Sequence, residues 1–259
     1  MNIIIMSLLA GVVGMGLGGL ITAAFGSRTD KMVSIFLSFA GGVMASIVFL
    51  ELIPESIEYS NIWTTVIGLL LGVAMVLILH NIIDKISAAS KGKSGFHESY
   101  AEFFHSDGML SNKSGMLRSG LIMIFAIALH NIPEGLAMGA AGYHDAALGL
   151  TLAIMIGLHN IPEGMAISAP LISGGLSKTK TVLLAFLTGS TTVIGALLGV
   201  LIGGISYTAL ALSFSAAGGA MLYVVFAEIL PQSVVTTKDK VPAIFALIGI
   251  ITGMLFTQI

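Results

Sequence analysis

A six-residue motif, HNIPEG, occurs twice in the sequence, at 130–135 and again at 159–164. In each copy the histidine and the glutamate are four residues apart, so on a helix both side chains share one face. Two imidazoles and two carboxylates form a mixed nitrogen and oxygen ligand set that suits zinc, iron or manganese. The repeated motif therefore predicts a metal site, whose ligands would be His130, Glu134, His159 and Glu163.

Both copies lie inside apolar stretches of about twenty residues, where an ionised side chain is costly. A divalent cation would neutralise the two carboxylates. In the simpler interpretation, the histidines and glutamates only hydrogen-bond across neighbouring helices. Asn131 and Asn160 would either add oxygen ligands or form hydrogen bonds that orient the ligands. The exact duplication of the motif favours a metal site.

The composition is that of a membrane protein. The chain has 259 residues, of which 56% are hydrophobic and only 9% charged, and its mean hydropathy is +1.02. A soluble domain carries about 25% charged residues. The absence of cysteine excludes disulfides, cysteine–zinc sites and thiolate catalysis. The lipid bilayer is thus an expected partner, and nothing indicates nucleic-acid binding.

Eight apolar segments are long enough to be considered as membrane helices. They lie at about 3–25, 32–54, 62–83, 119–141, 146–170, 179–202, 205–230 and 241–258. The breaks at 142–145 and 203–206 are the weakest, so a chain of seven helices is the main alternative. The first segment has no Lys or Arg before it and exceeds the length of a signal-peptide core, so we expect a retained helix.

The positive charges support the count of eight. All of them fall in or directly beside the loops between segments 1 and 2, 3 and 4, 5 and 6, and 7 and 8: Arg28, Lys31, Lys85, Lys91, Lys93, Lys113, Arg118, Lys178, Lys180, Lys238 and Lys240. Loops rich in Lys and Arg remain cytoplasmic. We therefore expect a multi-pass protein of the cell membrane with both termini outside the cytoplasm.

The long loop at about 84–118 is rich in Ser, Gly and Lys and would be cytoplasmic. Its composition predicts a flexible linker. It also contains His97 and His105, so a segment that collects metal ions weakly is the alternative.

A second repeat is less obvious. AGGVMASIVFLELIPES, at 40–56, matches AGGAMLYVVFAEILPQS, at 217–233, with an offset of 177 residues. The match aligns segment 2 with segment 7, which would cross the membrane in opposite directions. This pattern predicts an inverted repeat, a transporter architecture with the substrate site near the membrane midplane. The predicted fold is an all-α integral membrane protein of eight transmembrane helices in a 3+2+3 plan, with helices 1–3 and 6–8 repeated around helices 4–5.

These motifs resemble those of the ZIP (Zrt/Irt-like) family of divalent metal transporters, in particular its bacterial branch. The resemblance covers the whole chain and implies one transporter domain over 1–259, with a midplane metal site at the two HNIPEG motifs. It also implies that Met44, on helix 2, reaches this site. Met44 would otherwise simply pack in the core.

Some members of the family hold a second metal with the residues at the positions of Asn131 and Asn160 and a glutamate on helix 6. Here helix 6 has Thr192 at that position and contains no Asp or Glu. We therefore expect one strong metal position and leave the second open.

Two further glutamates align in the inverted repeat. Glu51 lies near the outer end of helix 2, and Glu228 near the inner end of helix 7. They would be the entrance and exit carboxylates of one pathway, unless they simply face lipid headgroups.

We thus expect a transporter of divalent metal cations, and not an enzyme. Zinc is the preferred substrate, and iron, manganese and cadmium also suit the ligands. The family resemblance implies movement into the cytoplasm. An intramembrane metalloenzyme is less well supported because the HExxH pattern is absent, and a proton or sodium transporter would not need paired imidazoles. The oligomeric state is not readable, and a homodimer is one option.

Overall fold

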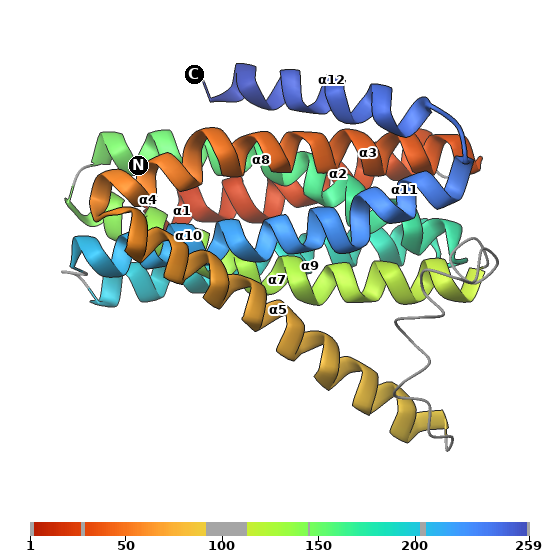
Figure 1. Cartoon of the computed structure of the whole chain (residues 1–259), viewed down its shortest axis with the longest axis horizontal. Helices are drawn as coiled ribbons and strands as arrows, with labels where there is room; N and C mark the ends of the chain where they lie inside the picture. Colours follow the sequence, from red (N-terminus) through yellow and green to blue (C-terminus); the bar gives the residue numbers. More distant parts are fainter. Residues whose placement is uncertain (1–2, 27–28, 92–112, 145, 203–205, 258–259) are drawn as a thin grey trace.

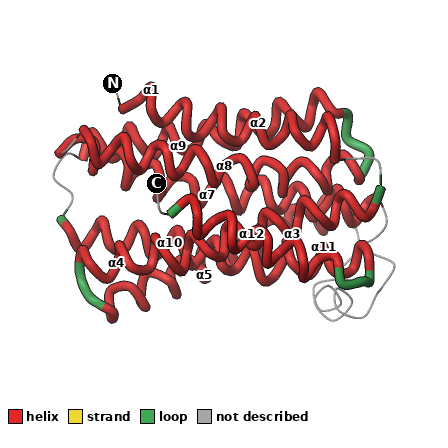
Figure 2. The backbone as a smooth tube through the Cα atoms, turned by 90° about the horizontal axis from the view of Figure 1, so that it is seen from above, coloured by secondary structure: helices red, strands yellow, loops and turns green. Residues whose placement is uncertain are grey.

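The computed structural model describes residues 3–26, 29–91, 113–144, 146–202 and 206–257. Within these ranges the chain is helical apart from short turns and contains no strand. Most helices run along one common direction and form a bundle (Figure 1; Figure 2). The all-α prediction is confirmed.

Each predicted apolar segment coincides with a helical segment. The elements are α1 (Ile3–Ser7), η1 (Leu8–Val13), α2 (Gly14–Ile21), η2 (Thr22–Gly26), α3 (Asp30–Ile47), η3 (Val48–Leu52), α4 (Ile53–Tyr59), α5 (Ile62–Lys91), α7 (Lys113–His144), α8 (Ala146–Ser173), α9 (Lys178–Ile202), α10 (Tyr207–Val224), η4 (Val225–Ile229), α11 (Leu230–Thr237) and α12 (Val241–Phe256). The η elements are π-type turns: η1, η3 and η4 join the helices on either side of them into longer helices, and η2 continues α2 to Gly26. Both weak breaks in the sequence separate two helices, as the count of eight requires.

Six of these helical segments are long and apolar enough to span a membrane. They are Ile3–Phe25, Asp30–Tyr59, Gly115–Tyr143, Gly149–Ser173, Lys178–Leu201 and Tyr207–Thr237. Two more helical segments, Ile62–Ile78 and Val241–Phe256, are apolar but shorter. The architecture is that of an integral membrane protein.

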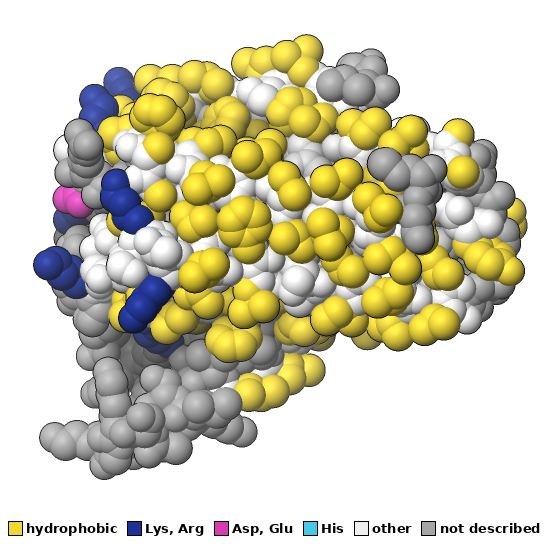
Figure 3. Space-filling model, turned by 180° about the vertical axis from the view of Figure 1, so that it is seen from behind, with side chains coloured by type: hydrophobic (Ala, Val, Ile, Leu, Met, Phe, Trp, Pro, Cys, Tyr) yellow, Lys and Arg dark blue, Asp and Glu magenta, His cyan; other side chains and the backbone are white. Residues whose placement is uncertain are grey.

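The surface agrees with this assignment. Apolar side chains cover most of the visible face, and the Lys and Arg side chains gather at one end of the bundle (Figure 3). Both termini lie toward the opposite end (Figure 1). An apolar belt capped by positive charge at one end is the pattern expected for a protein in a bilayer.

The predicted loop at 84–118 is shorter than expected. Helix α5 continues to Lys91 and α7 already begins at Lys113, because the stretch ISAAS before Lys91 contains no helix-breaking Gly or Pro. The remainder, with His97 and His105, lies outside the described residues.

Two π-type turns occupy matching positions in the second repeat. Val48–Leu52 and Val225–Ile229 are separated by 177 residues, and each precedes a proline, Pro54 or Pro231. Proline cannot donate the next helical hydrogen bond, and a wider turn accommodates the interruption. Glu51 and Glu228 both lie within these turns.

Close helix contacts also recur at the same offset. A Cβ atom on Gly42 of α3 would lie 2.1 Å from the Ala246 carbonyl oxygen of α12. A Cβ atom on Gly219 of α10 would lie 2.1 Å from the Leu69 carbonyl oxygen of α5. Since 42 and 219, and also 69 and 246, differ by 177, residues at this offset pack in the same way.

Two buried serines make a further matched pair of contacts. The Ser34 hydroxyl donates to the Ser233 carbonyl oxygen at 2.8 Å, and the Ser56 hydroxyl donates to the Ala211 carbonyl oxygen at 2.8 Å. Residues 34 and 211, like 56 and 233, differ by 177. The donor residue of each bond therefore aligns in the repeat with the acceptor residue of the other bond.

Candidate metal centre

The two HNIPEG motifs lie near the middle of helices α7 and α8, which pack against each other. Their histidines and glutamates are all buried, with at most 2% of any side chain exposed. The structure therefore brings together the four predicted ligands, His130, Glu134, His159 and Glu163.

Each histidine pairs with the glutamate of the other motif. His130 Nε2 lies 3.0 Å from Glu163 Oε1, and His159 Nε2 lies 3.3 Å from Glu134 Oε2. The sequence placed each pair on one face of its own helix. Because α7 and α8 run in opposite directions side by side, the first residue of one motif meets the fifth residue of the other.

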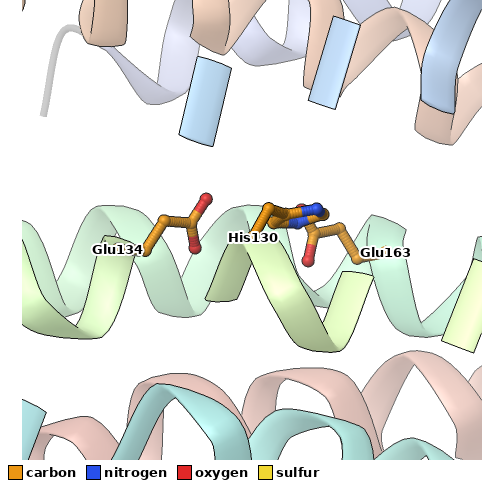
Figure 4. Close-up of side chains that lie close together, drawn as sticks. All are labelled: His130, Glu134 and Glu163. Atoms are coloured by element: carbon orange, nitrogen blue, oxygen red, sulfur yellow. The ribbon is translucent and has the colours of Figure 1, made fainter. Parts of the chain in front are cut away.

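Three of these residues already have the spacing of a metal site. One ligand atom each from His130, Glu134 and Glu163 lies within 4.8 Å of the others. Figure 4 shows the His130 ring beside the Glu163 carboxylate, with Glu134 on the other side of that ring. Each glutamate keeps a second buried oxygen, Glu134 Oε1 or Glu163 Oε2, that has no hydrogen-bond partner in the described residues. Such oxygens are free to bind a cation.

Glycines in both motifs let further helices approach closely. A Cβ atom on Gly135 would lie 2.0 Å from the Thr192 carbonyl oxygen of α9, and one on Gly164 would lie 2.1 Å from the Met15 carbonyl oxygen of α2. Pro133 and Pro162, inside the same helices, interrupt the regular hydrogen bonding beside the ligands. Backbone contact with α9 and α2 thus holds the ligand-bearing turns in place.

The two asparagines have different surroundings. Asn160 Nδ2 donates to the Ala10 carbonyl oxygen in the η1 turn at 3.0 Å. Neither polar side-chain atom of Asn131 has a hydrogen-bond partner among the residues that the structure describes, and the same holds for the Thr192 hydroxyl. Asn160 therefore also ties α8 to the first helix, while Asn131 keeps its full hydrogen-bonding capacity.

The remaining predicted residues, Met44, Glu51 and Glu228, are also buried. Met44 is fully buried on α3, and α3 packs against α8. Glu51 and Glu228 are buried in their π-type turns, with 9% and 5% of their surfaces exposed. Glu51 interacts electrostatically with His159, Glu134 and Glu55.

Glu55 was not singled out in the sequence. It lies four residues after Glu51 on the same helix face and is only partly buried. The spacing of the two glutamates in ELIPE was the signal that would have identified it.

Comparison with known proteins identifies the family. The family model described as ZIP Zinc transporter matches residues 1–259, which is the whole chain. The chain belongs to the ZIP family.

Three bacterial relatives are similar over nearly their full length, and each bears the name zinc transporter ZupT. The one from Chlorobaculum parvum is 34% identical over 96% of this chain and 92% of its own. The Akkermansia muciniphila protein is 33% identical over 100% and 97%, and the Streptococcus mutans protein 31% over 98% and 94%.

Membership in the ZIP family confirms the resemblance to its bacterial branch. ZIP proteins are transporters and not enzymes, so the metalloenzyme alternative is excluded. The several membrane-span candidates agree with a protein of the cell membrane.

Proposed function

We propose that this protein transports zinc across the cell membrane through the centre formed by His130, Glu134, His159 and Glu163. The observation that carries the proposal is a pair of buried glutamates within membrane-spanning helices, each with one oxygen that has no hydrogen-bond partner in the described part of the chain. Buried carboxylates at this depth are costly unless paired or bound to a cation. Zinc is the substrate named for the relatives, and iron, manganese and cadmium suit the same ligand types.

The two histidine–glutamate pairs also explain how the carrier could exist without its cargo. In the metal-free protein each imidazole partly satisfies a carboxylate of the opposite helix. Zinc would replace both contacts, taking nitrogen and oxygen ligands from the two helices and displacing any protons they hold. The same side chains would then stabilise both the empty and the loaded carrier.

Two further residues complete the proposed ligand shell, and a third positions it. Met44, which is fully buried, would contribute a thioether from helix 2. Asn131 would contribute an amide oxygen, because the Asn131 side chain makes no hydrogen bond in the described structure. Asn160 would act mainly by positioning α8, through its bond to Ala10. With Thr192 on helix 6, one metal position is favoured over two.

The matched contacts support the 3+2+3 plan. The glycine contacts join helix 2 to helix 8 and helix 7 to helix 3, and the serine hydrogen bonds join helix 2 to helix 7, always with residues that match at the offset of 177. Helices 1 and 6 are related in the same way: a Cβ atom on Gly18 would lie 2.1 Å from the Ile161 carbonyl oxygen, and one on Gly195 would lie 2.1 Å from that of Ile132. Residues 18 and 195 differ by 177, and their partners are equivalent positions of the two HNIPEG motifs. Alternating access would then exchange the roles of the two repeats around α7 and α8.

The charge distribution supports an orientation with the Lys- and Arg-rich end in the cytoplasm and both termini outside. In this orientation Glu51 lies toward the outside and Glu228 toward the cytoplasm, and zinc would pass the first on entry and the second on exit.

Glu51→Gln should raise the zinc KM of uptake from the outer side, and an unchanged KM would contradict this assignment. A homodimer in the membrane remains a prediction.

Purified protein in proteoliposomes tests the function. We expect saturable accumulation of zinc by vesicles that contain an entrapped chelator dye, with iron, manganese and cadmium measured in parallel to rank the substrates. Protein-free vesicles and vesicles with heat-denatured protein are the controls. Folded wild-type protein that moves none of these cations under a metal gradient would contradict the proposal.

A further inference from the structure

Two methionines occupy equivalent positions in the repeat. Met44 and Met221 differ by 177 residues, and each precedes by seven residues the glutamate of its π-type turn. Both side chains are fully buried. The family resemblance gives a role to Met44 alone, so Met221 is left without one.

The surroundings of the two methionines are also equivalent. Helix α3, which carries Met44, packs against α8, and α10, which carries Met221, packs against α7. Each methionine thus lies on a helix that contacts one of the two ligand-bearing helices.

Close to the methionines, the two repeats approach each other. A Cβ atom on Gly41 would lie 3.1 Å from Ile229 Cγ2, and one on Gly218 would lie 3.7 Å from Leu52 Cβ. Residues 41 and 218, like 52 and 229, are related by the offset of 177. Met44 and Met221 are each three residues, about one helical turn, from this crossing. The two methionines therefore occupy matching positions beside the two contacts that join the repeats.

We propose that Met221 is a second thioether ligand of the transported cation, which it contacts on the inner half of the path as Met44 does on the outer half. The inference rests on the proposed function and extends it to the substrate class. A thioether is neutral and polarizable, so it adds affinity for zinc and cadmium. It adds no negative charge, which would slow the release of the ion. Manganese prefers oxygen ligands and gains little from sulfur. A methionine in each repeat would maintain this preference in both orientations of the carrier.

The alternative is that Met221 only packs in the core. Leucine has nearly the volume of methionine but no sulfur. Met221→Leu therefore keeps the packing of the side chain and removes only its capacity to bind the cation. Met15→Leu is the matched control, because the Met15 side chain is equally buried but packs against another helix. Its Cγ lies 3.0 Å from the place that a Cβ atom on Gly189 of α9 would take.

The first measurement is transport by proteoliposomes. Met221→Leu should reduce kcat/KM for cadmium by about tenfold, the lower end of the effect of losing a group that tunes a metal site. It should leave manganese uptake nearly unchanged. Met44→Leu should act similarly, and Met15→Leu should preserve the cadmium-to-manganese ratio of the wild type. An unchanged ratio in Met221→Leu would overturn the inference.

The second measurement does not depend on transport. X-ray absorption at the cadmium edge should detect sulfur next to cadmium bound to the detergent-solubilised wild type. This sulfur signal should weaken in Met44→Leu and in Met221→Leu and vanish in the double variant. A full signal in Met221→Leu would overturn the inference. Wild-type vesicles that move zinc while Met221→Leu behaves as wild type would refute the role of Met221 alone, whereas inactive wild-type vesicles would refute the proposed function itself.

Discussion

Glu163→Gln is expected to abolish zinc uptake. The substitution keeps the shape of the side chain but removes its negative charge, and it takes away the carboxylate that lies 3.0 Å from His130 Nε2. An amide oxygen is a much weaker zinc ligand than a carboxylate. We expect the initial rate of zinc uptake in proteoliposomes to fall by about a hundredfold or more, because loss of a residue that only orients a metal ligand already costs about 10–100-fold. Glu134→Gln should have the same effect, because the two glutamates have equivalent positions.

Asp239→Asn provides the matched control for these substitutions. Asp239 is an exposed carboxylate in the turn before α12, where it accepts a hydrogen bond from the Val241 backbone amide at 2.8 Å. Asparagine can accept the same bond, so uptake should remain close to that of the wild type. Substantial zinc uptake by folded Glu163→Gln would show that this carboxylate is not a ligand.

Gly42→Ala and Gly219→Ala are expected to destabilise the protein strongly and to a similar extent. In both cases the added methyl group would lie 2.1 Å from a carbonyl oxygen of the neighbouring helix, so the two backbones must separate. Overpacking of this kind costs about 1–3 kcal/mol of unfolding free energy, and more where backbone must move. Thermal unfolding in detergent, followed by the loss of monodisperse protein, measures the effect.

Gly157→Ala is the control for this pair. Its added Cβ atom would lie no closer than 3.4 Å to any neighbouring atom, an ordinary van der Waals contact. This variant should unfold near the wild-type temperature. A large effect at only one of the two equivalent glycines would count against the inverted repeat, because the repeat predicts that both substitutions disturb the same contact.

Much of the fold could be predicted because it depends on local patterns. Apolar segments interrupted by Lys and Arg specify the helices, and the four-residue spacing in HNIPEG specifies which side chains share a face. The pairing of His130 with Glu163 was harder to predict. It depends on the relative depth of two antiparallel helices, which the spacing within either helix does not contain.

The π-type turns and the backbone contacts could not be predicted from one sequence. Pro54 and Pro231 indicate an interruption of the helix, but a kink, a break or a wider turn would each accommodate a proline. Gly42 and Gly219 indicate a close approach without naming the partner helix. The bond from Asn160 to Ala10 likewise joins residues 150 positions apart, a distance over which local rules give no information.

The most direct test of the central claim is the location of bound zinc. Crystals of the protein grown with zinc should give an anomalous diffraction peak at the zinc edge between α7 and α8. Histidine nitrogen and glutamate oxygen from both HNIPEG motifs should lie within about 2.0–2.2 Å of this peak. Bound zinc found only elsewhere in the protein, with the four side chains still paired as His130–Glu163 and His159–Glu134, would contradict the account.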